Sequence, residues 1–344
     1  MKKLLACALA AMMLLGICCP VLAEDEVLVI YSARNERLNN IVIPAFEAAT
    51  GIKVEMITGS SGEVLQRVKS EVETGKVTVD IHWAADETML AANRDLFEVY
   101  VSSENDALYP QFQNDGTNCF NNAYAEPNVM IVNTEVLAKL GIEVNSYADL
   151  LQPELKGKIV SADPSASSSA FCQLTNWLLV MGEGETAAER YESDAAWKFT
   201  EDLLKGQDVK ITSSSSAVYK GVINGEYAVC LTYEDPCVTM IKDGATNVHI
   251  VYPVEGTVFL PAQIGIPTNC KNLEEAQAFV DFMLSETAQK FLAEHTTSRN
   301  IRPVEYKNDV MTPLADIKLA YEDSDYVIAH TAELKTRVGD IMNK

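Results

Sequence analysis

Apolar positions in the first third of the chain alternate between short strand-like runs and longer segments with helical spacing. The run VLVIYS (27–32) is rich in β-branched residues, and apolar positions at helical spacing follow it as far as Gly51. The pattern predicts strands at 27–32, 52–58 and 78–83, a helix at 38–50, and a second helix with Val64, Leu65, Val68 and Val72 on one face. Strands that alternate with helices predict a parallel sheet covered by helices.

A second series of the same kind begins near residue 128. Its predicted strands cover 128–133, 158–162, 209–212 and 227–233, and its predicted helices cover 167–181, 273–284, 286–295 and a long region from 313 to the end. No internal repeat or Gly/Ser-rich linker separates the two series, which favours lobes joined by crossing strands. We expect an α/β chain whose lobes are mixed, mostly parallel sheets flanked by helices, one formed by 24–125 with about 253–300 and the other by 126–252 with about 301–344.

The first residues have the features of an export signal. Lys2 and Lys3 precede an apolar run over 4–17, and Ala23 ends a segment of small and apolar residues that suits cleavage after it. Cys18 offers a lipoprotein alternative, although the bulky Ile17 before it is unusual for lipid modification. Nothing later in the chain approaches the roughly 20 consecutive apolar residues of a membrane helix. We expect an exported chain, soluble after cleavage and located in the periplasm or otherwise outside the cytoplasm.

The formal net charge of the chain is −22. Such an excess of carboxylates argues against nucleic acid or an anionic membrane surface as a partner. It says little about a small ligand, because a cleft can carry a local potential opposite to the global one.

Five cysteines remain once the predicted leader is removed, and an odd number leaves at least one thiol free or paired between chains. Cys230 and Cys237 could bridge locally in an oxidising compartment. Their spacing matches no metal or redox motif, so buried thiols are the favoured interpretation.

Three serine-rich segments stand where predicted strands hand over to helices, at 59–63, 165–169 and 213–216. Hydroxyls and unpaired N–H groups at the positive end of a helix suit a phosphate, phosphonate or carboxylate. In open α/β sheets, ligands bind at these carboxyl ends of the strands. Ordinary helix capping, which also favours serine, is the alternative. The candidate ligand contacts from these segments are Ser60, Ser61, Gly62, Ser167, Ser168, Ser169 and Ser215.

Charged and aromatic residues at other predicted strand ends are further candidates. Arg34 follows the first strand and could pair with an anion or stay a solvated loop charge. Tyr233 and Asp235 end a late strand and could contact the ligand, or the acidic residues there could favour a helix N-terminus. Tyr31 and Trp83 could line a pocket or pack in the core.

Enzyme signatures are not evident. The chain has four histidines, none of them in an H-E-x-x-H arrangement, and it has no G-x-S-x-G elbow. A triad assembled from distant residues stays an alternative. The favoured interpretation is a binding protein without a cofactor.

Several ordered segments resemble a known family: EVLVIYSARNERLNNIVIPAFEAATGIKVEMITGSSGEVLQRVKSE, VDIHWAAD, ELKGKIVSADPSASSSAF and INGEYAVCLTYEDP. Together they resemble the periplasmic ferric-iron-type family of extracellular solute-binding proteins, which serve ABC importers, over nearly the whole mature chain. The resemblance implies a two-lobed periplasmic binding protein fold of type II, whose lobes close over a small ligand. It also implies an ABC importer permease as partner, and monomeric action suits such a shuttle.

The resemblance leaves the ligand open. Ferric binders of this family typically use a histidine after the first strand, a glutamate after the third and two adjacent late tyrosines. The matching stretches here carry Asn35, Ala85 or Asp86, and Tyr233-Glu234. Ferric iron needs several hard oxygen donors, so the set Tyr233, Asp86 and Glu234 is only an alternative. Relatives that take sugar phosphates, aminoethylphosphonate or thiamine phosphates resemble this chain in the Ser-Ser-Gly-Glu segment, so an organic phosphate or phosphonate is favoured.

Overall fold

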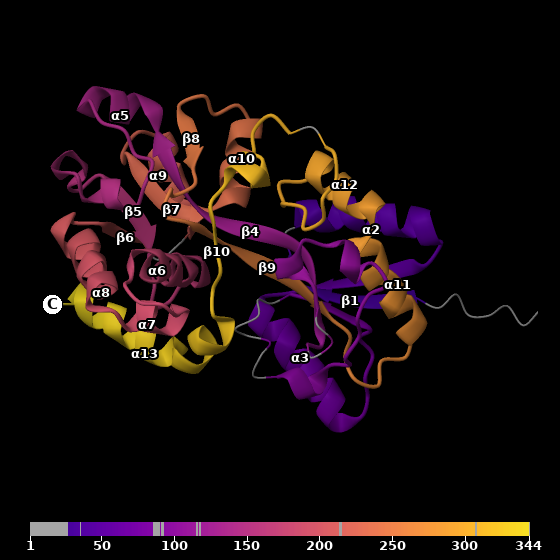
Figure 1. Cartoon of the computed structure of the whole chain (residues 1–344). Helices are drawn as coiled ribbons and strands as arrows, with labels where there is room; N and C mark the ends of the chain where they lie inside the picture. Colours follow the sequence, from indigo (N-terminus) through magenta and orange to yellow (C-terminus); the bar gives the residue numbers. More distant parts are fainter. Residues whose placement is uncertain are drawn as a thin grey trace, which may run out of the picture.

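The computed structural model describes residues 27–34, 36–84, 90, 93–114, 116, 118–212, 215–306 and 308–343, without the side chains of 168, 215 and 216. The predicted leader lies outside these residues. Two lobes share a pair of crossing strands, β4 (Phe120–Asn133) and β9 (Thr257–Gly265), as Figure 1 shows. The first half of β4 pairs antiparallel with β9, and its second half pairs with strands of the other lobe. One continuous strand thus belongs to both sheets.

Lobe 1 contains the N-terminal strands in the order β2-β1-β3-β9-β4. Its strands are β1 (Val27–Ser32), β2 (Lys53–Thr58) and β3 (Ile81–Trp83), and its helices are α2 (Glu36–Thr50), α3 (Ser61–Thr74), α11 (Leu273–Leu284) and α12 (Glu286–His295). β1 lies parallel to both β2 and β3. The face of α2 with Leu38, Val42 and Phe46 is buried, and the Phe46 ring meets Phe279 of α11 edge-on at 5.1 Å. Helical periodicity therefore directs α2 onto the sheet.

Lobe 2 continues the sheet in the order β4-β7-β5-β6, with β8 on β4 as well. Its strands are β5 (Ile159–Ala162), β6 (Lys210–Thr212), β7 (Val229–Tyr233) and β8 (Val248–Val251). Its helices are α5 (Thr134–Leu140), α6 (Ser168–Met181), α7 (Ala187–Glu192), α8 (Asp194–Glu201), α9 (Ser215–Ile223), α10 (Glu234–Lys242) and α13 (Ser324–Asn343). Tyr147, Trp177 and Phe199 form its aromatic centre.

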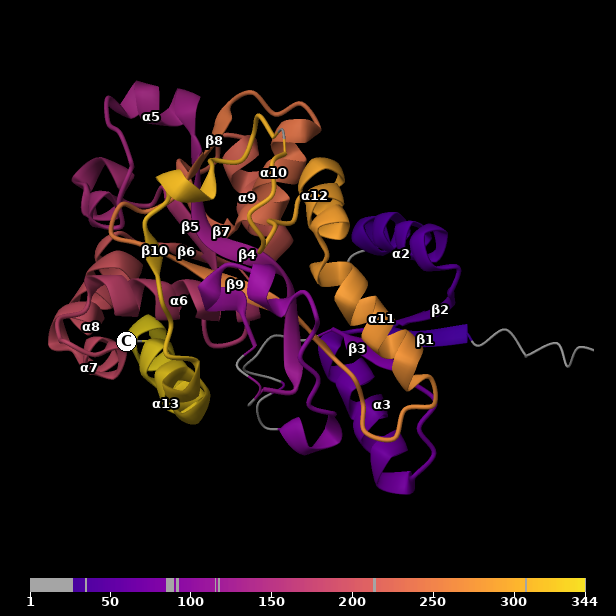
Figure 2. The same ribbon diagram turned by 45° about the vertical axis from the view of Figure 1, so that its right-hand side comes forward.

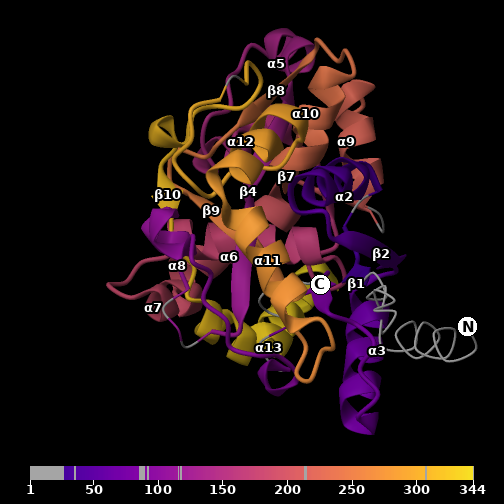
Figure 3. The same ribbon diagram turned by 90° about the vertical axis from the view of Figure 1, so that its right-hand side faces the viewer.

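The helices lie in layers on either side of the sheets. In all three views α3 and α13 lie below the crossing strands, and α10 and α12 lie above them (Figures 2 and 3). Short helical turns connect the elements at Arg94–Leu96, Asn105–Ala107, Pro110–Phe112, Ala148–Leu151, Pro153–Leu155, Asp202–Gly206 and Leu314–Asp316. In the part of the chain that the structure describes, no helix is both long and apolar enough to cross a membrane.

A strap over 313–323 returns the chain from lobe 1 to lobe 2. The prediction of a helix beginning at 313 is wrong, because β10 (Leu319–Ala320) pairs parallel with β9 here and α13 begins only at Ser324. The Asp323 carboxylate accepts the N–H of Tyr326 and so caps the helix start. Gly256 passes beneath the strap with φ +143°, and a Cβ there would lie 3.1 Å from the Cβ of Ala320. Glycine is needed at this crossing.

Cys230 and Cys237 in lobe 2 are free thiols, in agreement with the favoured interpretation. Cys230 on β7 and Cys237 on α10 are fully buried in an apolar cluster. Burial raises the pKa of both thiols well above the ordinary range. They pack as small apolar side chains.

Candidate ligand-binding site

The end of β1 places a cation at the rim of lobe 1. The N–H of Arg34 donates to the Ser32 hydroxyl at 3.0 Å, and the Asn39 amide donates to the Arg34 carbonyl at 3.2 Å, which fixes the turn. The guanidinium carbon of Arg34 lies 5.6 Å from the centre of the Tyr124 ring. Arg34 also lines an open pocket at the carboxyl ends of β1 and β2, together with Gly59. A cation and the start of α3 thus share one surface.

The start of α3 shows the capping role that the sequence gives as the alternative for serine. Ser60 caps the helix, and the Glu63 carboxylate accepts from its N–H at 2.9 Å and its hydroxyl at 2.8 Å, which lowers the pKa of Glu63. Ser61 donates its hydroxyl to the carbonyl of Ala84 at 2.6 Å and so ties the helix to the end of β3. Gly62 is exposed, and a Cβ there would meet nothing within 4 Å. The first N–H groups of the helix lack intrahelical acceptors, as at any helix start.

The start of α6 carries a second group of hydroxyls in lobe 2. Asp163 accepts from both the N–H and the hydroxyl of Ser165, at 2.8 and 2.6 Å, and this closes the turn after β5. Ser167 caps α6 by accepting from the N–H of Ala170, and its hydroxyl lies 3.0 Å from that of Ser169. The predicted side-chain contact of Ser168 lies outside the described residues. Capping and a cluster of hydroxyls coexist here.

The third serine segment is only partly described. α9 begins at Ser215, in agreement with the predicted strand-to-helix junction. The predicted contact from the Ser215 side chain lies outside the described residues, as do the predicted alternative metal donor Asp86 and the neighbouring Ala85 and Asn35.

The end of β7 places one aromatic and two acidic residues side by side. Tyr233 is the N-cap residue of α10 and is partly exposed, and its backbone pairs with Asn128 of β4. Asp235 accepts a hydrogen bond from the hydroxyl of Thr297. Burial, and secondly the charge of Glu126, raises the pKa of Asp235 to about 7. This carboxyl is therefore turned toward the segment that follows α12.

Glu234 is occupied by partners within the protein. Its carboxylate accepts two hydrogen bonds from Arg299, at 3.0 and 2.5 Å, and another from the hydroxyl of Tyr252. An iron ion would have to break this buried pair to use Glu234, which does not favour the alternative set of donors. Across the described ranges, no three His, Cys, Asp or Glu residues are grouped as a metal site.

The aromatic candidates belong to the core. Tyr31 and Trp83 are fully buried, and the Trp83 ring packs edge-on against Phe279 at 5.9 Å. Arg299 and Gln263 are both polar and buried, and neither was among the residues predicted from the sequence. The polar residues of otherwise apolar crossing strands, such as Asn122 in FNNAYA and Gln263 in LPAQIG, were the available signal.

Residues 42–317 match the protein family "Bacterial extracellular solute-binding protein". The chain belongs to this family. Solute-binding proteins of this kind are transport proteins that bind a small ligand and interact with a membrane permease, and the family implies a location outside the cytoplasm. The resemblance in the sequence is thereby confirmed at the level of the family.

Individual relatives of this solute-binding protein differ in what they carry. "Iron uptake protein A1" of Synechocystis sp. is 27% identical over 291 residues, which cover 79% of this chain and 75% of the relative. The periplasmic binding protein AfuA from Actinobacillus pleuropneumoniae, solved with exogenous fructose-6-phosphate bound, has a TM-score of 0.73, 24% identity, and coverage of 92% of this chain and 98% of AfuA. Iron-bound HitA from Pseudomonas aeruginosa has a TM-score of 0.71, 19% identity, and coverage of 91% and 99%. These likenesses confirm the two-lobed periplasmic binding protein fold.

Proposed function

We propose that this chain captures a small organic anion, bearing a phosphate or phosphonate group, for an ABC importer. The observations that carry the proposal are that Arg34 lies beside the start of α3 at the carboxyl ends of lobe 1 strands, and that α6 begins with a group of hydroxyls at the carboxyl end of β5 in lobe 2. Helix N-termini and an arginine complement a phosphate in charge and in hydrogen-bond direction. AfuA, which has the same fold, was solved with a sugar phosphate bound.

The site residues in this proposal are Ser60, Ser61, Gly62 and Arg34 from lobe 1, and Ser167, Ser168, Ser169, Ser215, Tyr233 and Asp235 from lobe 2. The anion docks on one lobe, and closure adds the contacts of the other and excludes water. Closure is favoured only as far as the ligand binds the closed state better than the open state. A monomer is sufficient for this cycle.

Ferric iron is the competing cargo, since one similar protein is named for iron uptake and another was solved with iron bound. The pairing of Glu234 with Arg299 favours the organic anion over iron. The two proposed ligands are distinguished by the colour of the loaded protein, because a tyrosinate bound to ferric iron absorbs visible light. A colourless protein after incubation with ferric citrate supports the organic anion.

A thermal-shift screen tests the proposal directly. The full chain is exported with its leader and heated with hexose phosphates, 2-aminoethylphosphonate, thiamine phosphate, putrescine or ferric citrate. A ligand at 100 times its Kd stabilises the protein by about 2.7 kcal/mol, which raises the melting temperature measurably. A shift with a phosphate or phosphonate is expected, and a shift with ferric citrate alone would overturn the proposal.

Arg34 supplies the sharpest variant. Arg34→Met is expected to weaken binding of the identified anion by about 10-fold or more, since a charge-assisted hydrogen bond contributes about 1.5–3 kcal/mol. Arg337→Met is the matched control, because Arg337 also lies over an aromatic ring, that of Trp197, on the outer helix α13. Equal affinities of the two variants for the anion would show that Arg34 does not contribute to the binding site.

We also propose that the leader is removed after Ala23 and that the lobes divide as the sequence predicts, at about residues 126, 253 and 301. N-terminal sequencing of the exported protein tests the cleavage, and a lipid-modified Cys18 or Cys19 would contradict it.

A further inference from the structure

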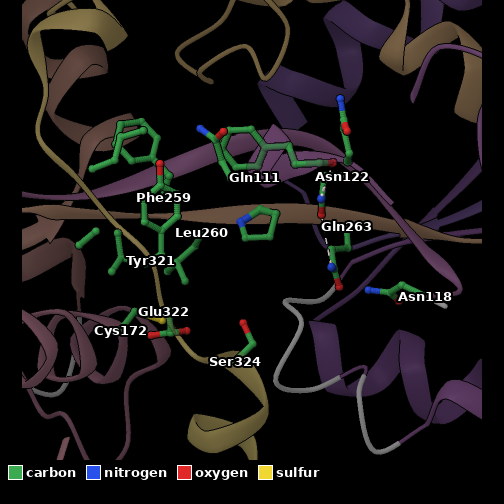
Figure 4. A pocket seen from close by; sticks show the side chains of 16 residues that line it. Gln111, Asn118, Asn122, Cys172, Phe259, Leu260, Gln263, Tyr321, Glu322 and Ser324 are labelled. Carbon is green, nitrogen blue, oxygen red and sulfur yellow. Dashed lines mark hydrogen bonds between the residues drawn. The ribbon is translucent and has the colours of Figure 1, made fainter. Parts of the chain in front are cut away.

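A second polar cavity lies against the crossing strands. It encloses about 220 Å³. Its walls come from the loop before β4, from β4 and β9 themselves, from α6, and from the strap with the start of α13. Figure 4 shows these side chains around the opening, with Gln263 and Asn122 joined by a hydrogen bond. Both lobes therefore contribute to this cavity.

Gln263 lines the cavity, and its side-chain amide holds a buried, unsatisfied acceptor. The side chain is only 2% exposed, and its carbonyl oxygen Oε1 has no hydrogen-bond partner. Its Nε2 donates to Oδ1 of Asn122 at 3.3 Å, and Nδ2 of Asn122 donates to the carbonyl of Phe112 at 2.9 Å. A backbone carbonyl can only accept, so both amides are fixed in this orientation. Oε1 is therefore held as an acceptor without a donor, which is costly when buried.

The lining residues select against an anion. Among the described residues that line the cavity there is no Lys, Arg or His, and the only carboxylate is that of Glu322, which accepts from the Thr175 hydroxyl at 2.7 Å. The remaining polar lining is mostly carboxamide, from Gln111, Gln113, Asn118, Asn122 and Gln263. Carboxamides both donate and accept, as the hydroxyl groups of a neutral polyol require.

The size of the cavity and its aromatic lining narrow the class of possible ligands further. The volume lies below the roughly 300–1,000 Å³ typical of pockets for drug-sized ligands. Phe259 and Tyr321 add apolar surface, which suits the C–H face of a sugar ring or cyclitol.

We propose that this cavity, beside the strands that join the lobes, binds a neutral, hydroxyl-rich molecule of monosaccharide size, and that a small rotation of the Gln263 side chain lets a ligand hydroxyl donate to Oε1. The site is separate from the proposed anion site in its residues and its charge preference. Because both lobes line it, an occupant that prefers one arrangement of the lobes shifts their equilibrium.

Isothermal titration calorimetry with myo-inositol, D-glucose and D-fructose at millimolar concentrations tests the proposal. At least one of these neutral probes is expected to bind the wild-type protein. Gln263→Met keeps the length and volume of the side chain but removes Oε1, and is expected to weaken that binding at least 10-fold. Gln66→Met, the same change on the exposed face of α3, is expected to leave it unchanged.

Two results would overturn the proposal: no binding of any neutral probe to the wild type, or equal affinity in Gln263→Met. Circular dichroism and the melting temperature of the Gln263→Met protein establish that it is folded. The outcome is distinguishable from that of the anion proposal, because Arg34→Met is expected to leave binding of the neutral probe unchanged.

Discussion

Arg299 and Glu234 form a buried ion pair that joins α10 to the segment after α12. Each side chain is 1% exposed, and the two hydrogen bonds run from Nε to Oε2 and from Nη2 to Oε1. Arg299 also donates to the carbonyl of Thr312 at 2.9 Å, and its backbone pairs with Ala125 of β4. The pair therefore fixes the start of α10, and with it Tyr233, relative to the crossing strands.

Loss of one partner of this pair is expected to be strongly destabilising. Arg299→Met leaves the Glu234 carboxylate buried and unpaired, which costs about 3–5 kcal/mol of the free energy of unfolding. The double variant Arg299→Met/Glu234→Leu removes both charges and is expected to recover much of that loss. Urea unfolding measures both values.

The exposed pair Lys69–Glu73 on α3 supplies the control for this experiment. Lys69→Ala is expected to change stability by less than about 1 kcal/mol, as for other surface pairs. A similar small effect of Arg299→Met would show that the buried pair does not hold α10 in place.

The lowered pKa of His82 predicts that the free energy of unfolding depends on pH. Burial, and secondly the charge of Arg34, lowers the pKa of His82 to about 3, against about 6.5 in the unfolded chain. The folded state thus binds fewer protons, so its stability is complete above about pH 6.5 and falls as the pH decreases toward 3. By pH 5 the loss from this group is about 2 kcal/mol.

The variant His82→Phe removes this titration while keeping an aromatic ring beside Phe97. Its free energy of unfolding is expected to fall less than that of the wild type between about pH 7 and pH 5. His249 on β8 is exposed, and His249→Phe controls for the loss of one histidine. Parallel pH profiles for wild type and His82→Phe would contradict the assignment.

Two capping boxes with the same chemistry allow the effect of a capping residue on the stability of the protein to be distinguished from its effect on ligand binding. Ser60 with Glu63 begins α3, and Thr186 with Glu189 begins α7 on the far side of lobe 2. Ser60→Ala and Thr186→Ala are each expected to cost about 1 kcal/mol in urea unfolding. Only Ser60→Ala is expected to weaken anion binding as well, measured by calorimetry. Unchanged affinity would leave Ser60 with capping alone.

The buried thiols predict resistance to alkylation. Cys230 and Cys237 are fully buried with raised pKa values, so the reactive thiolate is scarce in the native protein. Iodoacetamide followed by peptide mass spectrometry is expected to find both unmodified without denaturant and modified in urea. The melting temperature is expected to be the same with and without reductant, and a decrease on reduction would indicate a disulfide.

The spacing of apolar residues along the sequence predicted those helices and strands whose side chains pack against only one neighbouring layer. The predicted bounds of α11 and α12, 273–284 and 286–295, are confirmed because their apolar periodicity and the polar Ser285 between them are local signals. The first half of β4 was missed, because Asn121 and Asn122 interrupt its apolar run. Both make long-range hydrogen bonds, to the carbonyls of Tyr100 and Phe112, that sequence cannot display.

The helix starts of the candidate site were predictable from the sequence, whereas the contacts between distant residues were not. Serine-rich junctions were found because helix starts have a local signature, and α3 and α6 do begin at them. The partner of Glu234 was not predictable, because Arg299 lies 65 positions away and joins it only through the fold. The strap was mistaken for helix because its pairing with β9 is equally remote in sequence.

The shared strand pair also governs the order in which the chain can acquire its structure. β9 lies between β3 and β4 in the sheet of lobe 1, yet it follows β5, β6, β7 and β8 of lobe 2 along the chain. A polypeptide that is synthesised or exported from its N-terminus cannot complete this sheet until β9 is present. Contacts so distant in sequence also form slowly. Lobe 2 can assemble β5, β6 and β7 from consecutive residues beforehand. The N-terminal half of the protein is thus expected to be the last to mature, which lengthens the period in which its strands are still unpaired.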